Sequence, residues 1–68
     1  MLFVVKLLRD NNISLTAFSK MLSSRHFLKK FAKERDFTID ELNIIKDKLI
    51  DLHLIDVDFD IGDLLNEV

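Results

Sequence analysis

Five basic side chains gather in one short stretch near the middle of this sequence, at a spacing that suits contacts with phosphate groups. They are Arg25, His26, Lys29, Lys30 and Lys33. In a helix of 3.6 residues per turn they would share one side. The opposite side would carry Phe27, Leu28, Phe31 and Ala32. Because exposed cations bind phosphates, and arginine or histidine near a helix start can approach base edges, we predict that these five residues bind nucleic acid. The alternative is a charged face that only keeps a small domain soluble.

Four acidic residues near the end of the chain resemble a calcium-binding loop in their spacing. Asp56, Asp58, Asp60 and Glu67 fall at its first, third, fifth and twelfth positions. The sixth position needs glycine for a sharp turn, and here it is Ile61. We therefore predict an acidic surface with a helix cap at Asp60, and no metal site.

Catalytic patterns are also missing from the sequence. The two histidines, His26 and His53, lie in different predicted helices without a cysteine or a paired carboxylate at ligand spacing. We expect His53 to be a partly buried, hydrogen-bonded residue of the fourth helix. A chain of 68 residues with one glycine has no glycine-rich phosphate loop and little room for a cleft. The prediction is a protein that is not an enzyme, with no cofactor and no small-molecule substrate.

Composition limits the class of protein further. The absence of cysteine favours a cytoplasmic protein, and the apolar run 1–5 is interrupted by Lys6 far short of a membrane span. The net charge of −2 hides a segregation of sign. Residues 20–35 carry six cations and one acid, whereas residues 36–68 carry ten acids and two lysines. Two surfaces with different electrostatic preferences are expected.

The elements that must position these residues are helices, delimited by polar caps. Ser14 suits an N-cap, Thr38 and Glu41 have the spacing of a capping box, and Asp60 can cap a last short helix. A core stripe of the fourth helix is expected at Leu42, Ile45, Leu49 and Leu52. We predict an all-α, compact four- to five-helix domain spanning residues 1–68, with a helix-turn-helix core and helices at about 2–11, 15–22, 24–34, 39–53 and 61–67. Residues 55–61 alternate apolar and acidic residues, so an edge strand is the alternative to a loop there.

The order of these elements resembles the lambda-repressor-like, Cro-type helix-turn-helix family of small bacteriophage regulators, over about residues 2–54. Residues 13–22 look like its second helix, with Phe18 and Leu22 in the core and Ser19 where helices approach closely. Leu28 and Phe31 would be the buried positions of its recognition helix. Residues 36–42 are similar to the start of its fourth helix. The resemblance implies a transcriptional regulator, or genetic-switch protein, that binds DNA through the third helix, and we expect it to do so as a homodimer.

The acidic third of the chain favours a second hypothesis. So much negative charge repels phosphate within a Debye length, about 8 Å at physiological salt, and suits a basic protein partner instead. The alternative function is therefore an antirepressor that binds another repressor and blocks its DNA-binding surface. We predict that its partner-binding residues are Ile44, Asp47, Asp51, Asp56 and Asp58.

Overall fold

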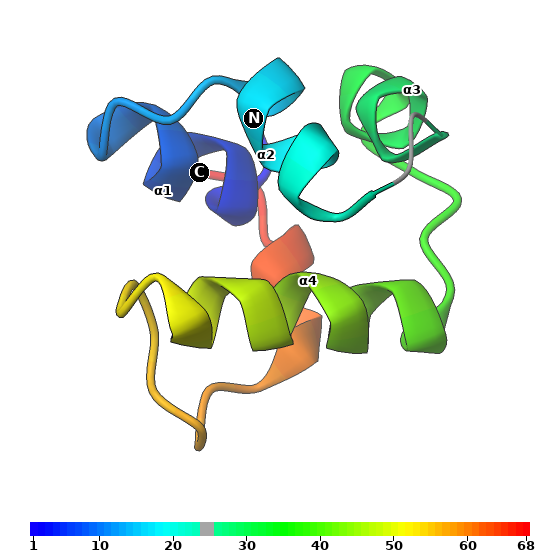
Figure 1. Cartoon of the computed structure of the whole chain (residues 1–68). Coiled ribbons are helices and arrows are strands. Elements are labelled where there is room, and N and C mark those ends of the chain that lie inside the picture. Colours follow the sequence, from blue (N-terminus) through cyan, green and yellow to red (C-terminus); the bar gives the residue numbers. More distant parts are fainter. Residues whose placement is uncertain (24–25) are drawn as a thin grey trace.

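Helices make up the regular structure of the protein, as predicted. The computed structural model describes residues 1–23 and 26–68, and these form four α-helices and one short 3₁₀ helix (Figure 1). The helices are α1 (Phe3–Asp10), α2 (Leu15–Met21), α3 (His26–Lys33), α4 (Ile39–Asp51) and η1 (Ile61–Leu65). The all-α prediction is confirmed. The loop prediction for residues 55–60 is confirmed as well, because none of them forms a strand.

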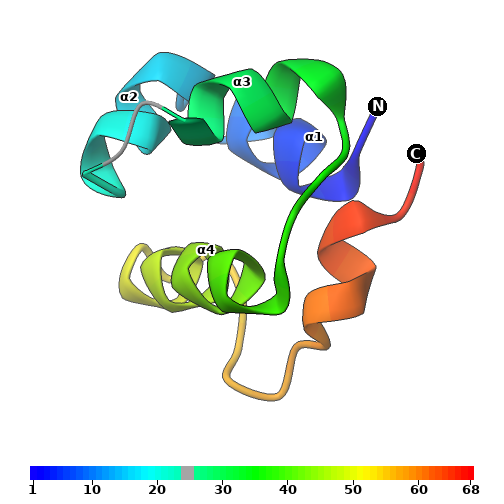
Figure 2. The ribbon, with the colours of Figure 1, turned by 90° about the vertical axis from the view of Figure 1, so that its right-hand side faces the viewer.

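The helices lie in two layers around one core. α1, α2 and α3 form the upper layer and α4 the lower one, while η1 lies beside α4 and against α1 (Figures 1 and 2). The two ends of the chain lie side by side, because Phe3 N donates to Asn66 O at 2.7 Å and Leu2 and Glu67 form an antiparallel bridge. Within the upper layer, α2 packs on α3.

The predicted caps begin three of these elements. Ser14 Oγ accepts a hydrogen bond from Ala17 N at 3.1 Å at the start of α2. At the start of α4, Thr38 Oγ1 accepts from Glu41 N at 3.1 Å, and Glu41 Oε1 accepts from Thr38 N at 2.8 Å. Asp60 Oδ1 accepts from Gly62 N at 2.8 Å before η1. Each cap satisfies a backbone donor that the helix itself leaves unpaired, so the capping predictions are confirmed.

The C-terminal ends of the four α-helices use left-handed residues other than glycine. Asn12, Ser23, Glu34 and His53 have φ values of 60°, 59°, 57° and 60°. After α4, His53 N donates to Ile50 O and Leu54 N donates to Leu49 O, both at 2.9 Å, which is the Schellman arrangement. His53 is therefore an exposed helix-ending residue, and the prediction that it is partly buried is wrong.

Aromatic residues hold the two layers together. Phe18, Phe27 and Phe31 are buried with the predicted α4 stripe of Leu42, Ile45 and Leu49, whereas Leu52 is half-buried. The ring of Phe31 lies 6.1 Å from that of Phe18 and 5.4 Å from that of Phe37, within the range of favourable aromatic pairs. Ser19 is buried as predicted, and its Oγ has no hydrogen-bond partner among the described residues.

Two details of the predicted helices are wrong. Leu28 and Ala32 were expected on the buried side of α3, yet both are exposed, because only the stripe of Phe27 and Phe31 meets the core. The last helix is a 3₁₀ helix that ends at Leu65, since Glu67 joins the bridge with Leu2. Residue 24, the predicted start of the third helix, lies outside the described residues.

Candidate nucleic-acid interface

A single carboxylate joins α3 to α4. Glu41, in the first turn of α4, accepts hydrogen bonds from Lys30 Nζ at 2.5 Å on Oε1 and 2.7 Å on Oε2. His26 Nε2 lies 2.8 Å from Glu41 Oε2. The side chains of Lys30 and Glu41 are only 24% and 12% exposed. Two of the five predicted nucleic-acid-binding residues therefore contact α4, although the side chain of His26 remains 54% exposed.

The electrostatics of Glu41 follow from these contacts. The hydrogen bond from Lys30 lowers the pKa of Glu41 from 4.5 to about 2, helped by the Thr38 backbone N–H, His26 and the Thr38 hydroxyl, and opposed by desolvation. The carboxylate therefore stays ionised even in acidic solution near pH 4. Its negative charge neutralises the positive charge of Lys30 locally, so Lys30 has little left to offer a phosphate.

The remaining cations of α3 face solvent. Lys29 and Lys33 are exposed and lie one turn apart, and neither is hydrogen-bonded or ion-paired to another described residue. They share this side with Leu28, which is 37% exposed, and with Ala32. We call these four residues the α3 face. Arg25, the fifth predicted residue, lies outside the described residues. The predicted five-residue surface thus divides into an exposed pair and a pair engaged by Glu41.

An open groove borders the α3 face. Leu28 lines this groove, of about 600 Å³, together with the end of α1 and the start of α2. Its polar lining consists of Arg9, Asn12, Ser14 and Thr16. The guanidinium-bearing Arg9 therefore lies near Leu28, and it is a candidate residue that the sequence analysis did not identify. No local pattern marks Arg9, because it is 19 positions away from Leu28 and only the tertiary fold brings the two to one groove.

The predicted partner-binding residues also fall into two groups. Ile44 is 47% exposed on α4, with Asp40, Asp47 and Asp51 on the same side, and we call these four residues the α4 face. Lys48 lies at its edge, with Nζ 3.9 Å from Asp51 Oδ2.

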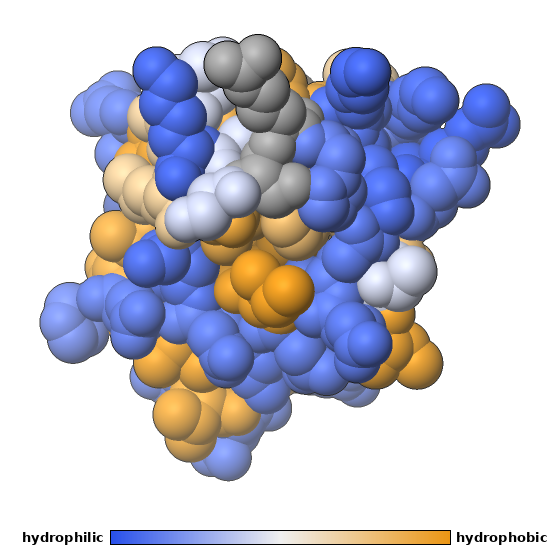
Figure 3. Space-filling model, turned by 45° about the vertical axis from the view of Figure 1, so that its right-hand side comes forward, coloured by the Kyte–Doolittle hydropathy of each residue, from blue (hydrophilic) through white to orange (hydrophobic). Residues whose placement is uncertain are grey.

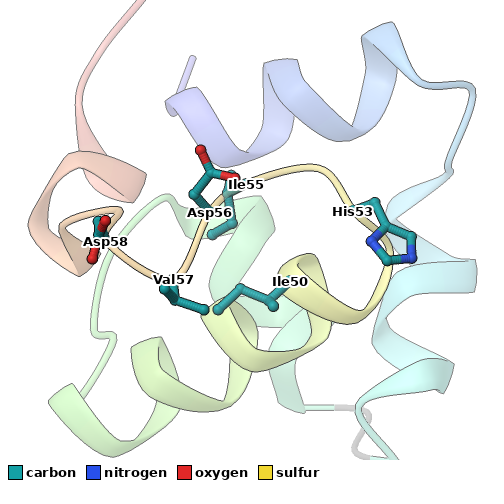
Figure 4. Close-up of a pocket in the computed structure, with 6 residues that line it drawn as sticks. All are labelled: Ile50, His53, Ile55, Asp56, Val57 and Asp58. Carbon is teal, nitrogen blue, oxygen red and sulfur yellow. The ribbon is translucent and has the colours of Figure 1, made fainter.

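Asp56 and Asp58 belong instead to the loop after α4. With Val57, they line an open hollow of about 440 Å³ that Ile50 and His53 also border. Figure 4 shows the side chains of Ile50 and Val57 pointing toward one another, while the carboxylates of Asp56 and Asp58 point away from them. Ile50, which borders the hollow, and Ile44 lie about 120° apart around α4 at 3.6 residues per turn, so the hollow and Ile44 are on different sides of the helix.

Hydrophobic side chains do not merge into one large patch on the face drawn in Figure 3. They form separate areas divided by hydrophilic residues. Isolated exposed apolar residues are common on protein surfaces, whereas a large continuous patch would indicate an obligate interface. Contacts made by this face are therefore expected to combine apolar residues with charges.

Comparison with known protein families, with curated proteins and with solved structures finds no match to this chain. Within residues 1–23 and 26–68, no helix has the length and apolar character needed to cross a membrane. Among the same residues, no three histidine or acidic side chains lie together as metal ligands would. A function must therefore be inferred from the charged surfaces themselves.

Proposed function

We propose that this chain is a small phage-type transcriptional regulator that binds DNA through the α3 face. The observation that carries the proposal is the exposed pair Lys29 and Lys33, which lie on adjacent turns of a helix whose other side is anchored by Phe27 and Phe31. Neither ammonium group is neutralised by another described residue, so both are available to phosphates. The sequence resemblance of residues 13–22 to the second helix of a helix-turn-helix family supports the same function.

The apolar members of the α3 face suit a role in a DNA groove. Leu28 and Ala32 present methyl groups beside the lysines, and a thymine methyl group is a partner for such side chains in the major groove. Lys29 and Lys33 would fix the position of the helix through phosphates. Since one short helix makes few phosphate contacts, we expect two copies to bind together.

A salt titration with random-sequence duplex DNA tests this proposal. Two neutralised phosphates predict that the logarithm of affinity falls with the logarithm of salt concentration at a slope of about −2 per copy. An affinity that does not change with salt, or no binding at low salt, would overturn the proposal.

A second function is favoured by the α4 face. The exposed Ile44 lies among aspartates, and the exposed Asp56 and Asp58 of the following loop add a second, separate group of negative charges. Such a surface suits the basic recognition helix of another repressor, which is the antirepressor function. A protein of this kind would leave duplex DNA unbound in the salt titration and co-purify with a second regulator. The pair of changes Asp56→Lys and Asp58→Lys would weaken that association without unfolding the domain.

A further inference from the structure

The α3 face and the α4 face lie on opposite sides of one core. α3 buries Phe27 and Phe31 from above, and α4 buries its apolar stripe from below, so their solvent-exposed sides point away from each other (Figures 1 and 2). The charges of the two faces therefore do not meet within one molecule. Among the described residues, α3 and α4 are joined by the contacts of Lys30 and His26 with Glu41, and none of these three residues belongs to either face. Each face is left open to an external partner.

The two faces are built alike with opposite charge. On the α3 face, the exposed Leu28 lies beside Lys29 and Lys33. On the α4 face, the exposed Ile44 lies beside Asp47 and Asp51, and Lys48 at the edge of the face lies 3.9 Å from Asp51 Oδ2. The three aspartates of the α4 face outnumber the one lysine at its edge, so the face is negative on balance. A large apolar residue bordered mainly by charges of one sign suits a small protein interface, where charge selects the partner and the apolar group is desolvated.

We propose that the α4 face of one copy binds the α3 face of a second copy. Ile44 packs on Leu28, and Asp47 and Asp51 lie opposite Lys29 and Lys33. Pairing of two α3 faces, or of two α4 faces, is opposed by like charges. The contact joins different surfaces of the two copies, so every associated copy keeps one free face and assembly continues head to tail.

The size and charge of the contact determine its behaviour. Two short helix faces bury less surface than a stable dimer interface needs, so association is weak and depends on concentration. Charge attraction contributes much of it, so association weakens as salt shortens the Debye length from about 30 Å at 0.01 M to about 8 Å at 0.15 M. If the α3 face also binds DNA, as proposed above, self-association and DNA compete for it.

Sedimentation velocity without nucleic acid tests the self-association independently of the DNA-binding proposal. Wild-type protein should show a mass that rises with concentration at low salt and returns to that of one chain at high salt. Leu28→Asp and Ile44→Asp, at exposed positions, should each lose association. An equimolar mixture of the two variants should form a 1:1 dimer, because the intact α4 face of Leu28→Asp binds the intact α3 face of Ile44→Asp. The dimer grows no further, because the two faces that remain free carry the substitutions.

Matched controls and a second variant keep the test decisive. Val57→Asp alters another exposed apolar residue, outside both faces, and should leave association unchanged. Circular dichroism reports whether each variant is folded, and Lys29→Glu with Lys33→Glu should lose association if Leu28→Asp proves unstable. A wild-type protein that stays monomeric at millimolar concentration and low salt would overturn the proposal. So would a mixture that associates no better than its components, or loss of association in Val57→Asp.

Discussion

Lys30 Nζ lies 2.7 Å from Glu41 Oε2, and the same carboxylate caps the first turn of α4 through Thr38 N. One side chain therefore performs two tasks. It completes a local capping box, and it fixes α3 against α4 by neutralising a half-buried ammonium. The contact joins α3 to the first turn of α4, in addition to the burial of Phe27 and Phe31 in the core.

Replacing Glu41 with glutamine should lower the stability of the fold more than a substitution at an exposed position does. Glutamine can still bond to Thr38 N, but it loses the charge that pairs with Lys30. We expect the free energy of unfolding to fall by about 1–2 kcal/mol, measured by urea denaturation. The matched control is Asp40→Asn, at the neighbouring exposed acid of the same turn. It should lower the free energy of unfolding by less than about 1 kcal/mol. Equal losses in the two variants would show that the Lys30 contact adds nothing.

The low pKa of Glu41 predicts how stability depends on pH. Its folded value of about 2 lies below the ordinary value of 4.5, so the carboxylate stabilises the fold fully above pH 4.5 and loses this contribution as pH falls toward 2. A pKa shift of this size corresponds to about 3 kcal/mol of stability. The actual contribution is smaller, because water at the edge of the protein screens the interaction. The stability difference between wild type and Glu41→Gln should shrink as pH falls from 4.5 toward 2, where the carboxylate of the wild-type protein becomes protonated. A difference that grows in acid would contradict this account.

The left-handed helix ends predict stabilising substitutions. His53→Gly should raise the free energy of unfolding by up to about 1 kcal/mol, because glycine adopts a φ of 60° without the steric cost that histidine has there. Asn12→Gly should gain less, since asparagine tolerates this conformation better. Thermal or urea unfolding measures both. A gain at Asn12 that equals or exceeds the gain at His53 would argue against steric strain as the cause.

The two sides of α3 should respond differently to truncation. Phe31→Ala should lower stability by about 3–5 kcal/mol, a large share of what a domain of this size possesses. Leu28→Ala, on the exposed side, should change it by less than about 1 kcal/mol. Chemical denaturation of both variants checks this directly. Comparable losses would mean that Leu28 is buried after all, as the sequence pattern predicted.

Local signals in the sequence predicted the helices well. The caps at Ser14, Thr38 and Asp60 depend on residues at most three positions apart. Such local contacts can be predicted without knowing how the helices pack. The core stripe of α4 was predicted in the same way, because its residues are three or four positions apart. Leu28 was misplaced because a helical wheel shows which residues share a side, but not how wide a strip the neighbouring helices cover.

The candidate site could be predicted only in part. Lys29 and Lys33 were identified from their spacing alone and are exposed as a binding surface requires. Lys30 was predicted to share their surface, yet its partner Glu41 is eleven residues away and belongs to another helix. Only the crossing of α3 over α4 determines that Lys30 is neutralised, and no periodicity in the sequence carries that information.

The central claim is that Lys29 and Lys33 bind phosphates, and the salt dependence of DNA binding by their double variant tests it most directly. Lys29→Gln with Lys33→Gln should weaken binding to duplex DNA and make the slope of log affinity against log salt shallower by about two. Lys6→Gln with Lys46→Gln, which removes the same charge from α1 and α4, should leave the slope unchanged. Equal slopes for both double variants would contradict the account, because binding would then depend on net charge and not on the α3 face.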